Sequence, residues 1–140
     1  MRIPSQISDR YWLFELNEAY RFKKPREERA SGKWLIFDHA ERIDALWEVI
    51  STAIKNGQLG PSAKVATAKP NPNAKDNATR VICVFTEDYN DREDVHRVEQ
   101  ELRALGVKNR LVYKLDRDVG KYENRGDTNL IKEVSEAVDD

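Results

Sequence analysis

The segment from Arg80 to Leu105 changes its hydrophobic period from that of a strand to that of a helix, and this change strongly constrains the fold. Val81 to Phe85 is a compact run of β-branched and aromatic residues, which is typical of a strand covered on one or both faces. Asn90 and Asp91 can each cap a helix, and Gly106 supplies a left-handed stop. Between them, one apolar stripe has helical spacing: Val95, Val98, Leu102 and Leu105.

An earlier segment repeats this organisation. The short apolar run SGKWLIF, from Ser31 to Phe37, is followed after Asp38 by a second helical stripe, which Gly57 closes. Two amphipathic helices need a common apolar surface, which a sheet can provide. We therefore expect an α+β fold with a curved, mainly antiparallel sheet and two or three helices on one face. The expected strands are Lys33 to Phe37, Ala63 to Lys69, Arg80 to Thr86 and Arg110 to Leu115.

The segments outside this framework are less regular. Trp12, Phe14 and Leu16 alternate as in a strand, which we favour, although the other apolar residues of 11–20 leave a helix open as the alternative. The charge cluster from Lys23 to Arg29 is interpreted as a solvated turn. Turn-forming residues between positions 70 and 78 predict a long exposed hairpin loop, and the apolar residues of 130–138 predict a terminal helix.

Length and charge describe a soluble protein without a strong overall field. We expect the 140 residues to form a single domain over 1–140. The 24 basic and 25 acidic residues nearly cancel, so we expect no attraction to duplex nucleic acid or to an anionic membrane, and any anion site must be local. There is neither a membrane-spanning apolar run nor a signal-peptide pattern, so a cytoplasmic location is expected. The single cysteine, Cys83, is predicted to be a small core residue.

No metal or cofactor motif is evident. Two histidines and one cysteine are too few and too scattered for ordinary zinc spacing, and the six glycines form neither a phosphate loop nor a dinucleotide fingerprint. Five acids surround the start of the second predicted helix. They could bind a cation, but favourable capping and helix-dipole effects explain them at least as well. These acids are Glu87, Asp88, Asp91, Glu93 and Asp94.

Several motifs in series carry a family resemblance. SGKWLIF, IDALW, LGPSAKVAT, RVICVFTEDYNDRE, ALGV, LVYKLD and GKYENR occur in this order between Ser31 and Arg125. This series resembles the basophilic-leukaemia-expressed protein family, whose function is not established. The resemblance implies a fold like that of the messenger-cap-binding initiation factor 4E, and GKWLI and TEDYNDRE look like corresponding segments of that factor.

The likeness to initiation factor 4E raises the question of cap binding. Recognition of a methylated guanine needs two indole faces, an acid for the base edge and cations for the phosphates. Trp34 and Trp47 are predicted to be core residues, which leaves only Trp12 free to stack, so strict cap binding is not expected. The resemblance does place cations at or near the phosphate positions, with a threonine among them: Lys33, Lys64, Thr67, Lys69 and Arg80.

Members of the family are also described as carrying a phosphothreonine lyase domain. The resemblance to such lyases implies Lys64 as the base, with Lys33 and Arg125 as a phosphate clamp. In those lyases a histidine two positions after the first lysine donates the proton to the leaving phosphate, but here that position is Leu35. His39 is the nearest replacement acid, although a histidine at a helix entrance is more often a surface or capping residue.

Two functional hypotheses follow. The first is a binding module whose concave sheet face carries Lys33, Lys64, Arg80 and Arg125, with aromatic support from Trp12, and holds a nucleotide, an RNA end or a phosphopeptide. The alternative is a phosphothreonine lyase-like enzyme that uses Lys64 and His39. An interaction scaffold is a third possibility and predicts a contiguous exposed apolar patch on the helices.

Overall fold

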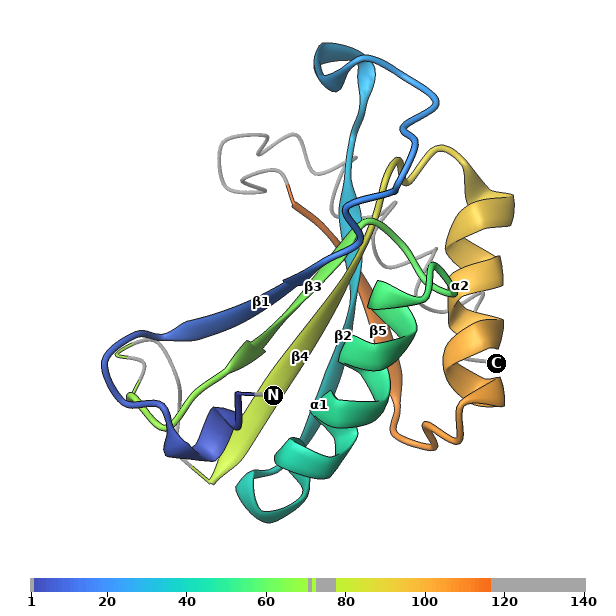
Figure 1. Cartoon of the computed structure of the whole chain (residues 1–140). Coiled ribbons are helices and arrows are strands. Elements are labelled where there is room, and N and C mark those ends of the chain that lie inside the picture. The colour runs from blue at the N-terminus through green and yellow to red at the C-terminus, as the bar shows by residue number, and fades with distance from the viewer. Residues whose placement is uncertain (1, 71, 73–77, 117–140) are drawn as a thin grey trace.

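A computed structural model describes residues 2–70, 72 and 78–116 of the chain, and within these residues five strands form one sheet (Figure 1). Every neighbouring pair is antiparallel, and the spatial order is first, third, fourth, second, fifth. The predicted N-terminal strand is confirmed, and it lies at one edge. The strands are β1 (Trp12–Leu16), β2 (Gly32–His39), β3 (Ser62–Ala66), β4 (Thr79–Thr86) and β5 (Leu111–Leu115).

Two α-helices lie on one side of this strongly twisted sheet (Figure 1). They are α1 (Ala40–Lys55) and α2 (Arg92–Ala104), and two short 3-10 turns, η1 (Pro4–Gln6) and η2 (Arg26–Glu28), precede them. The predicted α+β class with helices on one face is confirmed. Gly57 and Gly106 have positive φ angles of 76° and 95°, so both predicted left-handed stops are also confirmed. None of the helices in 2–70, 72 and 78–116 is long and apolar enough to cross a membrane.

The core lies between the helices and the sheet. Trp34 of β2 is completely buried, and its indole Nε1 donates a hydrogen bond to the backbone oxygen of Val95 at 3.0 Å. Its ring also meets Tyr113 of β5 edge to face, with 5.1 Å between centroids. Trp47 of α1 is 3% exposed. Both tryptophans are therefore core residues, as predicted.

Side chains that alternate away from the helices form a second surface, which we call the open face. Trp34, Ile82 and their buried neighbours face the helices, so the intervening positions of each strand face the opposite side. Cys83 lies on this side but is only 3% exposed, consistent with its predicted role as a small buried residue. The open face comprises Trp12, Phe14, Leu16, Lys33, Leu35, Phe37, His39, Ser62, Lys64, Ala66, Thr79, Val81, Cys83, Phe85, Val112 and Lys114.

Two predicted segments lie mostly or wholly outside the part of the chain that the structure describes. Most of the predicted hairpin loop over 70–78, and the whole predicted helix over 130–138, lie outside the described residues. The second predicted strand, Ala63 to Lys69, is shorter than expected, since β3 ends at Ala66. Directly after it, the hydroxyl of Thr67 donates a hydrogen bond to the backbone oxygen of Arg10.

Candidate functional site

Lys64 lies at the centre of an aromatic group on the open face. Its ammonium is 4.0 Å from the centroid of the Trp12 ring and 5.9 Å from that of Phe85. The three residues come from β3, β1 and β4, and their strands bring them together because side chains at alternate positions share one face. No carboxylate in the described part of the chain forms an ion pair with Lys64. The charge of Lys64 is thus held by rings and remains available to an anion.

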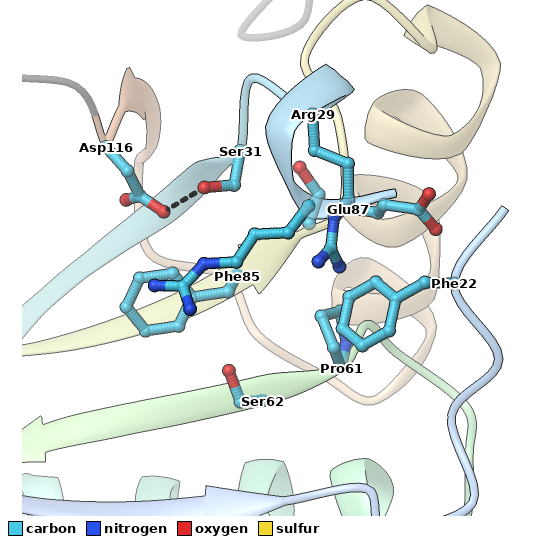
Figure 2. Close-up of a pocket in the computed structure, with 10 residues that line it drawn as sticks. Phe22, Arg29, Ser31, Pro61, Ser62, Phe85, Glu87 and Asp116 are labelled. Carbon is cyan, nitrogen blue, oxygen red and sulfur yellow. Dashed lines mark hydrogen bonds between the residues drawn. The ribbon is translucent and has the colours of Figure 1, made fainter. Parts of the chain in front are cut away.

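Lys33 lies on the other side of Phe85, 5.6 Å from the centroid of that ring. Its ammonium donates to Asp116 Oδ1 at 2.9 Å, while the Ser31 hydroxyl donates to Asp116 Oδ2 at 2.8 Å. Asp116 therefore fixes Lys33 and Ser31 relative to each other and offsets part of the lysine's charge. The hydrogen bond between Ser31 and Asp116 is visible in Figure 2.

A cavity of about 360 Å³ lies where Phe85 ends the open face (Figure 2). Its volume is within the usual range for small-molecule sites. The cavity is formed by the ends of several strands and by the connection between β1 and β2. Its lining contains two arginines, two acids, hydroxyl groups and apolar side chains: Phe22, Arg26, Arg29, Ser31, Pro61, Ser62, Phe85, Thr86, Glu87 and Asp116.

Two arginines of this cavity have unusual surroundings. The guanidinium of Arg29 lies 3.9 Å from the centroid of the Phe22 ring, which holds its plane in place. Neither this guanidinium nor that of Arg26 forms an ion pair or side-chain hydrogen bond with any residue in 2–70, 72 or 78–116. Two guanidinium groups that line one cavity without bonds to its acids can both donate to an anion that enters it. The arrangement is thus suited to a phosphate or carboxylate, which guanidinium groups bind in bidentate fashion.

The segment that carries these arginines is held in place by Glu87. Its carboxylate accepts hydrogen bonds from the backbone amide of Lys23 at 2.9 Å, from that of Lys24 at 3.0 Å and from the Tyr20 hydroxyl at 3.2 Å. Glu87 is only 6% exposed. Burial, followed by the charges of neighbouring carboxylates, raises the pKa of Tyr20, so its hydroxyl remains a donor at neutral pH. Glu87 thus connects the end of β4 to the segment that precedes the arginines.

Asp88 adds a second connection to the same segment. Its carboxylate accepts from Lys24 Nζ at 2.8 Å and from the Asn90 backbone amide at 3.1 Å, and its side chain is 3% exposed. Burial alone would raise the pKa of the Asp88 carboxyl. The hydrogen bonds from Lys24 and Asn90 outweigh burial, so the pKa of Asp88 is lowered in the folded protein.

The lowered pKa of Asp88 predicts a pH dependence of stability. The Asp88 carboxyl of the folded protein binds a proton less tightly than that of the unfolded chain. The ionised carboxylate therefore stabilises the fold fully above the pKa of Asp88 in the unfolded chain, about 3.9, and this stabilisation is lost as the pH falls through the lower pKa of Asp88 in the folded protein. We expect Asp88→Asn to be less stable than the unmodified protein at neutral pH. This difference should shrink steadily below about pH 4, as urea denaturation at a series of pH values can measure.

A matched control for this measurement is Asp44→Asn. Asp44 accepts a hydrogen bond from the Ser5 amide at 3.0 Å on an exposed part of the surface, far along the chain from Asp88. Its substitution should leave the acid-dependent loss of stability in place. A constant difference between Asp88→Asn and the unmodified protein from neutral pH to about pH 2 would contradict the assigned role.

The structure brings together only part of the predicted site. Lys33, Lys64 and Trp12 share the open face. Alternation along β4 instead places Arg80 on the same side as the buried Ile82, in register with Asp38, so Arg80 faces the helix side and does not join the two lysines. The physical reason is the two-residue period of a strand, which separates Arg80 from Phe85 by an odd number of positions. Arg125 lies outside the described residues.

The predicted acid of the lyase mechanism is also distant from the predicted base. His39 caps α1, and its Nδ1 accepts a hydrogen bond from the Glu41 amide at 3.2 Å. It is four residues along β2 from Leu35, which lies in the row of Cys83 and Lys64. Four residues of strand span about 13 Å, so the histidine is beyond hydrogen-bonding reach of a proton-transfer site at Lys64. The geometry therefore favours a capping role for His39.

Sequence reasoning missed the two arginines of the cavity. The charge cluster that contains Arg26 and Arg29 was interpreted as a solvated turn, and it is largely exposed, but it also lines the cavity. The sequence offers a partial signal, the acids Glu87 and Asp88 directly after a strand, but it does not identify the segment that supplies their donors. Among the acids near α2, Asp91 does cap the helix by accepting from the Asp94 amide. No metal-binding group of three or more ligating side chains occurs within the described residues.

Comparisons with known proteins identify the fold and the family of this chain. The fold is that of initiation factor 4E-like proteins: the chain is similar to Ascaris suum eIF4E-3, solved in complex with m2,2,7G cap, with a TM-score of 0.53. Sequence identity is 15%, and the match covers 75% of this chain and 62% of that chain, so the likeness shows the fold alone. The model of the basophilic leukemia-expressed protein Bles03 family matches residues 23–117, and the chain belongs to this family. The predicted family and fold are both confirmed.

Proposed function

We propose that this protein is a binding module for a phosphate-bearing ligand, which enters the cavity beside Phe85. The observation that carries the proposal is the pair Arg26 and Arg29, which line one cavity with no carboxylate partner in the described part of the chain. Charge-assisted bonds from guanidinium to phosphate oxygens are short, directional and about twice as strong as neutral ones. A phosphate group is the natural partner for two such forks in one small space.

The acids at the cavity bond to donors of the protein other than Arg26 and Arg29. Glu87 directs its carboxylate to two backbone amides and a tyrosine hydroxyl, and Asp116 directs its oxygens to Ser31 and Lys33. Both acids are therefore occupied by donors of the protein itself. A ligand phosphate in the cavity would meet the arginines and the hydroxyl groups of the lining, and Phe85 would offer an apolar surface to the rest of the molecule.

Lys64 and Trp12 extend the proposed site along the open face. Lys64 has no acidic partner among the described residues, so it supports binding of further negative charge or of an electron-rich ring beside Trp12. The nearly neutral molecule as a whole would not concentrate anions. Selectivity for phosphate would then depend on this local group of cations.

The proposal can be tested by thermal denaturation with matched pairs of compounds. A nucleoside monophosphate and phosphothreonine should each be compared with the unphosphorylated nucleoside and with threonine. If the site binds phosphate, at least one phosphorylated compound raises the melting temperature and its unphosphorylated counterpart does not, because a ligand of the native state stabilises it in proportion to occupancy. Arg26→Ala and Arg29→Ala should each weaken binding by about ten- to one-hundred-fold, the loss expected for a hydrogen bond to a charged group.

Arg21→Ala provides the control. Arg21 is exposed in the same segment but does not line the cavity, so its removal changes the net charge equally while the site is retained. Equal weakening by Arg21→Ala and Arg29→Ala would indicate a diffuse charge effect and would count against a built site. The proposal fails if neither phosphorylated compound, nor inorganic pyrophosphate, shifts the melting temperature at millimolar concentration.

A further inference from the structure

The open face combines exposed rings with lysines, and the acid that reaches it in the described part of the chain is Asp116, which follows β5 and pairs with Lys33. Phe14 is 61% exposed and Phe37 is 49% exposed, which is unusual for large aromatic side chains in the strands of a sheet. Three lysines occur at open-face positions: Lys33, Lys64 and Lys114. The described strands have no aspartate or glutamate at any of these positions, whereas Glu15 and Asp38 alternate to the helix side. The surface is therefore positive and aromatic in a protein whose net charge is −1.

The strand register arranges these side chains in rows across the sheet. One row runs from Phe14 through Lys64 and Cys83 to Leu35, and the next contains Phe85, Lys33 and Lys114. Phe37 and Trp12 lie beyond the first row, on the side away from Phe85. Neighbouring strands are about 4.8 Å apart, so the rings and cations are interleaved over roughly 20 Å of sheet, with the cavity at one border.

We propose that the open face binds single-stranded nucleic acid. The bases would stack on Phe14 and Phe37, and backbone phosphates would lie near Lys64 and Lys114. This inference rests on the proposed function, because it assigns the terminal phosphate of the strand to the cavity of Arg26 and Arg29. Aromatic side chains on an open sheet, with cations between them, are the means by which several protein folds bind single strands.

Chemistry favours a single strand over other anionic partners. In a duplex the faces of the bases are stacked on each other and cannot reach rings on a sheet, whereas an unpaired strand offers both base faces and phosphates. Lys64 and Lys114, which have no acidic partner among the described residues, give the charge complementarity that a polyanion requires, whereas Lys33 is paired with Asp116. Exposed rings at alternating positions add no benefit for a simple phosphate ion, so they point to a ligand that also carries flat apolar groups.

Fluorescence anisotropy of a labelled single-stranded RNA of about eight nucleotides, bearing a 5′-phosphate, tests the inference with the full chain. The single strand should bind more tightly than a duplex of the same sequence. Phe14→Ala and Phe37→Ala should each weaken binding at least about five-fold, as expected when one stacking ring is removed. Lys64→Ala and Lys114→Ala should each reduce the slope of log affinity against log salt by about 0.7.

Val49→Ala is the matched control for the ring variants, because Val49 is a 41% exposed apolar residue on α1, on the helix side. It should leave RNA binding unchanged. All variants should keep their melting temperatures within a few degrees, since the replaced side chains are exposed or, for Lys64, only partly buried. Equal affinity for the duplex and the single strand, or unchanged affinity in both phenylalanine variants, would overturn the inference.

The same titrations separate this inference from the proposed function. If a nucleoside monophosphate binds through Arg26 and Arg29 but the RNA binds no more tightly, the extended surface is ruled out and the phosphate site stands. If the RNA binds through Phe14 and Phe37 but is indifferent to both arginines, the surface stands and the assignment of the phosphate to the cavity is wrong. A phosphopeptide that binds more tightly than the RNA and also depends on Phe14 would overturn the choice of nucleic acid.

Discussion

Trp34→Ala is expected to lower the free energy of unfolding by about 3–5 kcal/mol, which is a large part of the total stability of an ordinary domain. The side chain is fully buried between the sheet and the helices. Its removal leaves a cavity against Tyr113 and also removes the donor to the Val95 oxygen, through which β2 is bonded to α2. Urea denaturation followed by circular dichroism measures the loss as a shift of the midpoint at unchanged slope.

Trp12→Ala makes the same chemical change at a position on the open face and serves as the control. Trp12 is only partly buried, and its ring contacts the ammonium of Lys64, so its loss should cost about 1 kcal/mol or less. Trp34→Phe separates the two contributions in the core, because it keeps a ring but removes the indole donor to the Val95 oxygen, at a cost of about 1 kcal/mol. If Trp34→Ala and Trp12→Ala were equally stable, the assignment of Trp34 to the core would be wrong.

The elements of the fold could be predicted because burial imposes a period on the sequence. The stripe that includes Val95 and Leu102 identifies α2, and Gly106 marks its end. The start of α2 was also predictable, because Asp91, one of the two expected caps, does cap it, whereas α1 begins at Ala40 through a cap by His39, and a histidine is not a typical capping residue. Local chemistry thus determined the elements and the first turn of α2 well, and the first turn of α1 less well.

The site was harder to predict because it depends on which face each strand turns towards the helices. The run from Val81 to Phe85 is apolar at every position, so the sequence does not reveal which of its two alternating sets of side chains the helices cover. Pairing with β2 decides it and directs Arg80 to the helix side. Lys33 and Lys64 were recognised through the family resemblance, and the register places them on one face.

Arg26 and Arg29 were missed for a different reason. Their position in space depends on hydrogen bonds between the segment that precedes them and Glu87, which is more than sixty residues further along the chain. No local pattern encodes such a contact. A charged cluster with a proline looks the same in the sequence whether it is solvated or held beside a cavity. Only the tertiary structure shows that the buried carboxylate needs donors and that this segment supplies them.

Glu87→Ala is expected to have two effects, because one carboxylate accepts from three donors of the arginine-bearing segment. The amides of Lys23 and Lys24 lose a charged acceptor, which should lower the free energy of unfolding by about 3 kcal/mol. The segment should then hold Arg26 and Arg29 less well, so binding of a phosphorylated compound should weaken about ten-fold or more. Thermal denaturation and calorimetric titration measure the two effects separately.

Amide hydrogen exchange distinguishes positioning of the segment from general destabilisation. In Glu87→Ala the amides of Lys23 and Lys24 should exchange much faster, while amides in the central strand β4 should exchange faster only to the extent that global stability falls. Glu93→Ala removes an exposed acid in the first turn of α2 and should cost less than about 1 kcal/mol without changing exchange at Lys23. If Glu87→Ala left both amides protected and ligand affinity unchanged, the segment would be held by its other contacts, of which the Asp88 ion pair with Lys24 is the nearest.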